Sequence, residues 1–88
     1  MKEDIPRGLL FLVATPIGNL DDFSLRGIKI LTQVDLVACE DTRVTKKLLD
    51  FLSLTKPLVS YREENEKKKS IELAELIESG QQVALVSD

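Results

Sequence analysis

The sequence predicts a single α/β domain over residues 1–88, built on an open parallel sheet with helices on both faces. Two observations predict it. Short apolar runs, which are typical of strands, alternate with amphipathic stretches, which are typical of helices, in the order β-α-β-α-β-α-β. No internal repeat, low-complexity tract or linker interrupts this alternation. Such a pattern favours parallel strands joined by right-handed crossovers.

The first predicted strand is Leu9–Ala14, which has no polar side chain and therefore suits a strand covered on both faces. A turn with Pro16, Gly18 and Asn19 follows it. The next helix has three apolar positions at helical spacing: Leu25, Ile28 and Leu31. Gly27 within this helix lowers helix propensity but permits close packing. Three residues can cap the helix: Asp21, Asp22 and Ser24.

The middle of the chain predicts a second strand at Asp35–Cys39, followed by a helix that Asp41 or Thr42 can cap. Apolar residues of this helix have the i, i+4, i+7, i+8 spacing of a surface helix on a core: Val44, Leu48, Phe51 and Leu52. A third strand is predicted at Pro57–Tyr61, because a proline is tolerated at the first position of a strand.

The last third of the chain predicts a helix over residues 63–79, closed by Gly80, and a fourth strand at Gln82–Val86. The expected buried side of the helix consists of Leu73, Ala74, Leu76 and Ile77. Two i, i+4 ion pairs are expected to support it: Glu63 with Lys67, and Glu64 with Lys68. Because no helix follows the fourth strand, we expect a domain truncated after that strand, with apolar sheet surface left uncovered.

The composition excludes several classes of function. With 12 basic and 15 acidic residues the net charge is −3, which argues against an autonomous nucleic-acid-binding module. The chain has no histidine and one cysteine, Cys39, so an internal disulfide, a zinc site of these ligands and Cys-His or Ser-His catalysis are excluded. Cys39 lies in an apolar strand and is interpreted as a core residue. A reducing, cytoplasmic location is the simplest interpretation, and the longest apolar run is too short to span a membrane.

Ligands of open parallel sheets bind beyond the carboxyl ends of the strands. Glu40–Arg43 places consecutive polar residues at such an end, where a carboxylate and a guanidinium can hold a substrate hydroxyl or a phosphate. The alternative is structural: Asp41 or Thr42 caps the helix, and Arg43 pairs with a nearby carboxylate. Residues 15–20 form either a tight turn or a ligand-binding loop, and they lack the glycine patterns of dinucleotide sites and P-loops.

Three segments resemble successive motifs of one family. They read Ala-Thr-Pro-Ile-Gly-Asn-Leu at 14–20, Val-Asp-Leu-Val-Ala-Cys-Glu-Asp-Thr-Arg at 34–43, and Val-Ala-Leu-Val-Ser-Asp at 83–88. The family is that of the bacterial small-subunit (16S) ribosomal RNA (cytidine-2′-O)-methyltransferases, within the tetrapyrrole methylase superfamily. The resemblance runs from Leu9 to Asp88. It points to the ribosomal RNA branch rather than to the cobalamin or siroheme branches.

This resemblance implies S-adenosylmethionine as methyl donor, small-subunit ribosomal RNA or the 30S subunit as substrate, and the strand order 3-2-4-1. No metal-binding residues are predicted. The implied cofactor-binding residues are Pro16, Ile17, Gly18 and Asp88. The candidate catalytic residues, which supply both charge types at the carboxyl edge, are Glu40, Asp41 and Arg43. The family's second domain is not in this chain, so we expect the chain alone to be inactive. RNA contacts are then expected from that domain or from the partner in a homodimer.

One departure from the family's pattern concerns the segment after the third strand. The family often has His-x-His-Asn-Glu there, whereas residues 62–66 read Arg-Glu-Glu-Asn-Glu. Asn65 and Glu66 match, and the missing histidines exclude a histidine general base in this segment. Two alternatives stay open: a sister methylase acting on a small molecule, and a non-catalytic α/β binding domain of the receiver type. The second would need an aspartate where Tyr61 and Arg62 stand.

Overall fold

The structure, a computed structural model, describes residues 8–15 and 23–87. Within these ranges the elements follow the predicted order: β1 (Leu9–Ala14), α1 (Leu25–Gln33), β2 (Leu36–Cys39), α2 (Thr42–Phe51), β3 (Leu58–Ser60), α3 (Glu66–Glu78) and β4 (Gln82–Ser87). The strands pair in parallel in the order β1-β4-β2-β3. The predicted α/β class and the strand order 3-2-4-1 are therefore confirmed.

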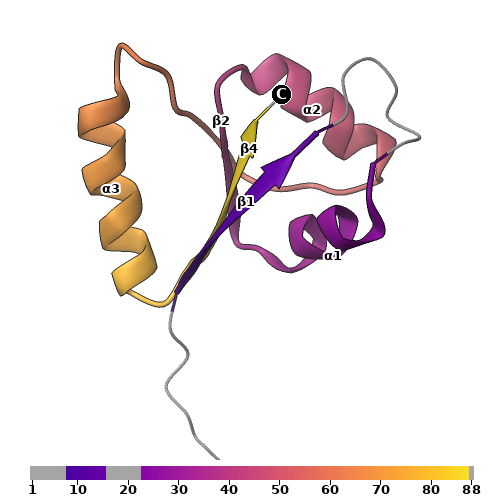
Figure 1. The fold of residues 1–88 in the computed structure, drawn as a ribbon, viewed down its shortest axis with the longest axis horizontal. Helices are drawn as coiled ribbons and strands as arrows, with labels where there is room; N and C mark the ends of the chain where they lie inside the picture. Colours follow the sequence, from indigo (N-terminus) through magenta and orange to yellow (C-terminus); the bar gives the residue numbers. More distant parts are fainter. Residues whose placement is uncertain (1–7, 16–22, 88) are drawn as a thin grey trace, which may run out of the picture.

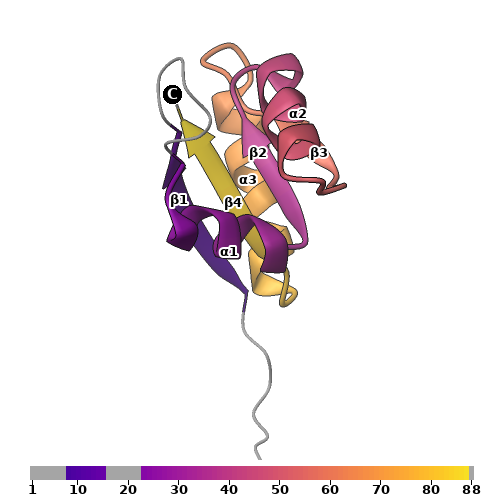
Figure 2. The ribbon, with the colours of Figure 1, turned by 90° about the vertical axis from the view of Figure 1, so that its right-hand side faces the viewer.

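Helices α1 and α2 cover one face of the sheet, and α3 covers the other (Figure 1). A view from the side shows the same layers, with α1 and α2 in front of the strands and α3 behind them (Figure 2). This arrangement follows from the handedness of parallel connections. The connections from β1 to β2 and from β2 to β3 run in one direction across the sheet, whereas the connection from β3 to β4 runs back. A right-handed crossover therefore places α3 on the opposite face.

The central strands supply side chains to both layers of the core. Val37 and Cys39 of β2 belong to the cluster beneath α1 and α2. Leu36 and Ala38, which alternate with them, pack in a second cluster with Leu73 of α3. All four residues of β2 are buried, as expected for an internal strand of a parallel sheet. The interpretation of Cys39 as a core residue is confirmed.

Helix α1 begins at one of the three predicted caps. The Ser24 hydroxyl oxygen accepts a hydrogen bond from the Gly27 N–H at 3.0 Å. Gly27 is buried, and a Cβ at this position would come within 2.8 Å of the Phe23 ring, so the predicted close packing is present. Of the three apolar positions at helical spacing, Ile28 and Leu31 pack in the core, whereas the Leu25 side chain is 86% exposed. Leu25 is the first residue of the helix, and the buried residues of the helix, Gly27 and Leu31, follow it.

Helix α2 presents a different apolar stripe from the predicted one. Leu48 and Leu49 are buried, and Thr45 with them, whereas Val44 and Phe51 are about half exposed. The predicted and the observed stripes both fit a 3.6-residue period, and both contain Leu48. The sequence pattern leaves open which flank of Leu48 meets the sheet, and packing against the strands decides it.

Helix α3 begins three residues later than predicted. Glu63 and Glu64 lie in the turn before it, so the predicted i, i+4 pairs from these residues are not helical pairs. Leu73 is buried, but the expectation for Ala74 is wrong because that residue is exposed. Gly80 closes the helix with a φ of 104°, the left-handed conformation expected of a glycine after a helix.

Strand β1 is covered on one face only. Phe11 and Val13 join the cluster beneath α1 and α2. Leu10 and Leu12 pair in register with Val83 and Leu85, which face α3, yet Leu12 is 75% exposed and Leu10 is 50% exposed. Helix α3 does not reach this edge of the sheet. The expectation that Leu9–Ala14 is covered on both faces is therefore wrong for the face that carries Leu10 and Leu12, where apolar sheet surface is exposed.

Candidate active site at the carboxyl edge of the sheet

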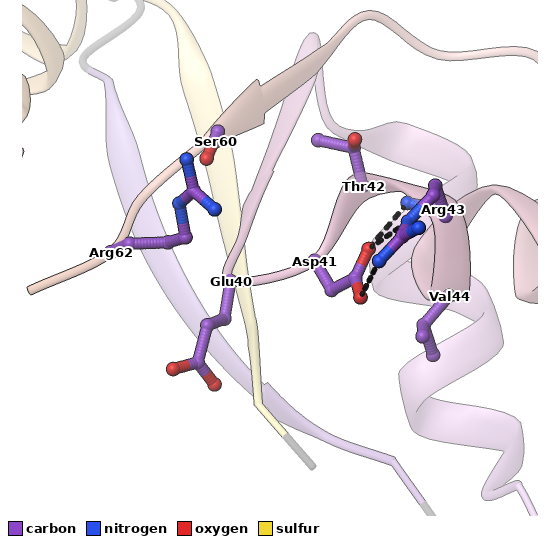
Figure 3. A pocket seen from close by; sticks show the side chains of 7 residues that line it. All are labelled: Glu40, Asp41, Thr42, Arg43, Val44, Ser60 and Arg62. Carbon is purple, nitrogen blue, oxygen red and sulfur yellow. Dashed lines mark hydrogen bonds and ion pairs between the residues drawn. The ribbon is translucent and has the colours of Figure 1, made fainter.

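A pocket opens where the chain leaves β2 and β3. Because α2 follows β2 on one face and α3 follows β3 on the other, the two loops diverge, as at the ligand-binding switch points of open α/β sheets. The pocket measures about 540 Å³ (Figure 3). Its lining residues are Glu40, Asp41, Thr42, Arg43, Val44, Ser60 and Arg62. The predicted catalytic residues are thus brought together at one pocket.

A second pocket of about 440 Å³ lies at the same edge, between the start of α3 and the end of β4. Its lining residues are Glu40, Tyr61, Arg62, Glu63, Glu66, Leu85, Val86 and Ser87. Two residues, Glu40 and Arg62, line both pockets. A ligand that occupies either pocket therefore meets the same carboxylate and the same guanidinium.

Glu40 is the first residue beyond β2, and its side chain is exposed. Its carboxylate points away from both Asp41 and Arg62 (Figure 3). Among the residues that the structure describes, none forms a hydrogen bond or an ion pair with this carboxylate. Glu40 is therefore available to accept a proton or a hydrogen bond from a ligand.

Asp41 has a structural role. Its Oδ1 accepts a hydrogen bond from the Arg43 N–H at 2.9 Å, which caps α2. The same carboxylate accepts bonds from Nε and Nη2 of Arg43, each at 3.3 Å. The side-chain hydrogen bond from Arg43 lowers the pKa of Asp41 below its ordinary value, and Asp41 raises the pKa of Arg43 in return. Of the two predicted caps, Asp41 is the one used.

The Arg43 side chain is 89% exposed and lies against Asp41. The structural interpretation of Glu40–Arg43 is therefore confirmed for two of its residues: Asp41 caps α2, and Arg43 forms an ion pair with Asp41. It does not involve Glu40, so one carboxylate of the segment stays accessible while the other is occupied.

Sequence reasoning missed Arg62 as a site residue. It lies two residues beyond β3, and the turn 63–65 folds back so that the Asn65 Oδ1 accepts a hydrogen bond from the Arg62 N–H at 2.7 Å. Asn65, five residues after the end of β3, is of a residue type that is common in such local turns. That residue type does not reveal that the turn lies beside Glu40, because this proximity depends on the pairing of β2 with β3.

The predicted cofactor-binding residues Pro16, Ile17, Gly18 and Asp88 lie outside the described residues. Their neighbours along the chain lie side by side. Thr15 donates to the Ser87 carbonyl twice, from its N–H at 2.9 Å and from its hydroxyl at 3.1 Å.

Within ranges 8–15 and 23–87 no cluster of three metal-ligating side chains occurs. No helix among the described residues is long and apolar enough to cross a membrane.

Comparison with known proteins supplies independent information. The family described as Tetrapyrrole (Corrin/Porphyrin) Methylases matches residues 9–88. The chain is 53% identical over 79 residues to "Ribosomal RNA small subunit methyltransferase I" of Mycoplasmopsis pulmonis, covering 90% of this chain and 36% of that protein. It is 49% identical over 81 residues to the Bacillus subtilis protein of the same name, covering 92% of this chain and 28% of that protein.

The chain thus spans about a third of the length of the curated relatives that it matches. One solved structure, a diphthine synthase, superposes with a TM-score of 0.67 over 89% of this chain and 32% of that one. At 23% sequence identity this similarity concerns the fold. It agrees with the parallel sheet and the two helical layers described above.

Proposed function

The chain belongs to the tetrapyrrole methylase family, and from that premise we propose that the protein carrying it methylates small-subunit ribosomal RNA with S-adenosylmethionine as donor. We propose further that the acceptor is the 2′-hydroxyl of a cytidine. The reaction is placed in the cytoplasm, where this substrate lies. A homodimer is proposed because a chain of net charge −3 needs other surfaces to bind RNA.

The observation that carries this proposal is the similarity to the relatives named as small-subunit ribosomal RNA methyltransferases, which extends over about nine-tenths of the chain. The site supports it. Both pockets lie at the carboxyl edge, and the only carboxylate there that both of them share, Glu40, has no partner among the described residues. Substrate identity within the family comes from these relatives rather than from the pocket alone.

The proposed chemistry assigns a distinct part to each candidate residue. S-adenosylmethionine, when bound, supplies a methyl group whose bonding electrons stay with the sulfur. The ribose hydroxyl that accepts the methyl group must lose its proton, and Glu40 is proposed to take it. Asp41 and Arg43 are proposed to hold the Glu40 loop against the start of α2, through the cap and the ion pair.

The residues proposed to hold the cofactor are Pro16, Ile17, Gly18 and Asp88. The described residues fit this assignment in two ways. Thr15 and Ser87, their chain neighbours, are hydrogen-bonded to each other at the carboxyl edge. In addition, the edge carries carboxylates, Glu40, Glu63 and Glu66, and these favour a cationic sulfonium.

The test uses the intact protein, radiolabelled S-adenosylmethionine and small ribosomal subunits from cells lacking the activity. We expect label in the small-subunit RNA, at one cytidine, in a dinucleotide that resists alkaline hydrolysis because a 2′-O-methyl group blocks strand cleavage. Label on a base instead would overturn the ribose assignment. No label on RNA, but label on a tetrapyrrole supplied in its place in a parallel assay, would favour the sister methylase that acts on a small molecule.

A further inference from the structure

We propose that Arg62 binds a phosphate group of the RNA substrate, and that Asn65 is the positioning residue that holds Arg62 in place. This inference rests on the proposed function, since it names a contact with the proposed substrate. Its starting point is location. Arg62 lies just beyond the carboxyl end of β3 and is the only cationic residue that lines both described pockets.

Hydrogen bonds hold the backbone in place on both sides of Arg62. The Tyr61 N–H donates to the Cys39 carbonyl at 2.7 Å, which extends the pairing of β2 with β3. The Asn65 Oδ1 accepts from the Arg62 N–H at 2.7 Å, and its Nδ2 donates to the Ser60 carbonyl at 3.2 Å. The Asn65 N–H also donates to the Arg62 carbonyl at 2.9 Å. The Arg62 side chain therefore starts from a fixed base, which lowers the entropy lost when it binds a ligand.

Arg62 is more available than Arg43, the other arginine of the site. Arg43 makes two side-chain bonds to Asp41 at 3.3 Å, and the pKa shifts of both groups reflect this pair. Among the described residues, Arg62 has one ion-pair contact, from Nε to Glu64 at 3.6 Å, with side chains 57% and 79% exposed. An exposed pair of this kind contributes little. Its exchange for a phosphate, which a guanidinium can bind through two hydrogen bonds, is therefore favourable.

The charges around Arg62 place the phosphate in the larger pocket. There Glu40 and Asp41 are balanced by Arg43 and Arg62, and the Glu40 carboxylate points away from the Arg62 guanidinium (Figure 3). The smaller pocket adds two more carboxylates without another cation, so it repels an anion. The guanidinium itself extends to the side of the larger pocket on which Ser60 lies.

The test measures binding of the intact protein to unmethylated small ribosomal subunits over a series of salt concentrations. The variants are Arg62→Gln, Arg62→Lys and the control Arg26→Gln. Arg26 is exposed on α1 and lines neither described pocket. Each phosphate contact contributes about 0.7 to the slope of log K against log salt for a single strand, and about 0.9 for a duplex.

We expect Arg62→Gln to reduce the slope of log K against log salt by about the contribution of one phosphate contact. We also expect it to weaken binding about tenfold at low salt. Arg62→Lys should keep the slope because it keeps the charge, and Arg26→Gln should match the unaltered protein. An unchanged slope in Arg62→Gln, with methylation still detectable in the unaltered protein, overturns this inference but not the proposed function. Failure of the unaltered protein to bind or methylate small subunits overturns both.

The role of Asn65 is tested by Asn65→Ala and Asn65→Asp. The alanine variant loses both side-chain hydrogen bonds, and we expect its salt slope to fall toward that of Arg62→Gln. The aspartate variant keeps an acceptor for the Arg62 N–H, and we expect partial recovery of the slope. A purely structural role would lower the melting temperature of Asn65→Ala and leave its slope unchanged, which would contradict the positioning role.

Discussion

Polar side chains have different roles at the two ends of the parallel strands, which are the amino edge, where the strands begin, and the carboxyl edge, where they end. At the amino edge they fasten the chain: Lys56 Nζ donates to the carbonyls of Thr32 and Val34 at 2.9 and 2.8 Å. The Asp35 Oδ2 accepts from the Gln82 N–H at 2.8 Å. At the carboxyl edge, Glu40 has no such partner among the described residues, and Arg62 has one weak ion pair. The amino edge thus uses these polar groups for the fold, whereas at the carboxyl edge structural groups such as Asp41 and Asn65 stand beside charges that are left for a ligand.

This difference shows how the fold accommodates a site. The folded state of a protein is only marginally stable. Polar groups that are left unpaired for a ligand do not contribute to that stability. The amino-edge bonds hold the crossover ends in place, so the carboxyl edge can keep exposed, weakly paired charges without loosening the strands.

The largest expected effect tests the free carboxylate. Glu40→Gln in the intact protein should lower the rate of methyl transfer by about 100-fold or more, because the amide cannot accept the proton. Asp35→Asn, the matched change at the amino edge, should keep the rate near that of the unaltered protein. Initial rates with small ribosomal subunits measure both. Equal losses in the two variants would remove the distinction between the edges.

The next effect concerns stability at the amino edge. Lys56→Met should lower the free energy of unfolding by about 1–2 kcal/mol, because it removes two charge-assisted bonds to backbone carbonyls. Lys46→Met is the control: its i, i+4 pair with Asp50 is exposed at both ends, and its loss should cost less than about 0.5 kcal/mol. Urea denaturation followed by circular dichroism compares them. A larger cost for Lys46→Met would contradict the assignment.

A smaller effect is expected for Arg43→Gln. Since Arg43 is bonded to Asp41 and is 89% exposed, we expect the methylation rate to fall only a few-fold, through a less rigid Glu40 loop. This loss should be well below that of Glu40→Gln. A loss as large as that of Glu40→Gln, at an unchanged melting temperature, would instead place Arg43 in direct contact with the substrate.

The smallest effect is a pH dependence at the cap of α2. The folded state lowers the pKa of Asp41, so the ionised carboxylate stabilises the fold above the ordinary aspartate value of about 4. This contribution is lost as the pH falls through the lowered pKa. Asp41→Asn keeps a capping oxygen but loses the charge. Its melting temperature should therefore lie slightly below that of the unaltered chain at pH 7, and the difference should shrink as the pH falls through the lowered pKa of Asp41. A constant difference would argue against the Arg43 pair as the cause.

Several features of the fold were predictable because they depend on local sequence. The four strands were found at nearly their observed bounds, since an apolar run bounded by turn residues or a proline suits a buried strand wherever it lies. The caps were limited to two or three candidates each, because only a few side chains can accept bonds from the first N–H groups of a helix. The strand order came from the family resemblance.

Other features were beyond local reasoning. The stripe of α2 was shifted by one position, because Val44 and Thr45 both flank Leu48 at acceptable spacing, and only contact with the sheet separates them. The exposure of Leu12 beside the buried Val13 depends on which faces α1 and α3 reach. Neither fact is present in the periodicity of the segment itself.

The sequence by itself determined the α/β class, the strands, the family, and the presence of charged residues at the carboxyl edge. Short-range patterns specify these features, because backbone preference and apolar spacing act within a few residues. Only the tertiary structure decided which charges are free. Asp41 is occupied by Arg43, and Glu40 is not. Arg62, from a different loop, joins Glu40 because β2 and β3 pair in parallel. The pairing of strands that are distant in the sequence decides which charged side chains lie together. Local sequence patterns do not predict this pairing.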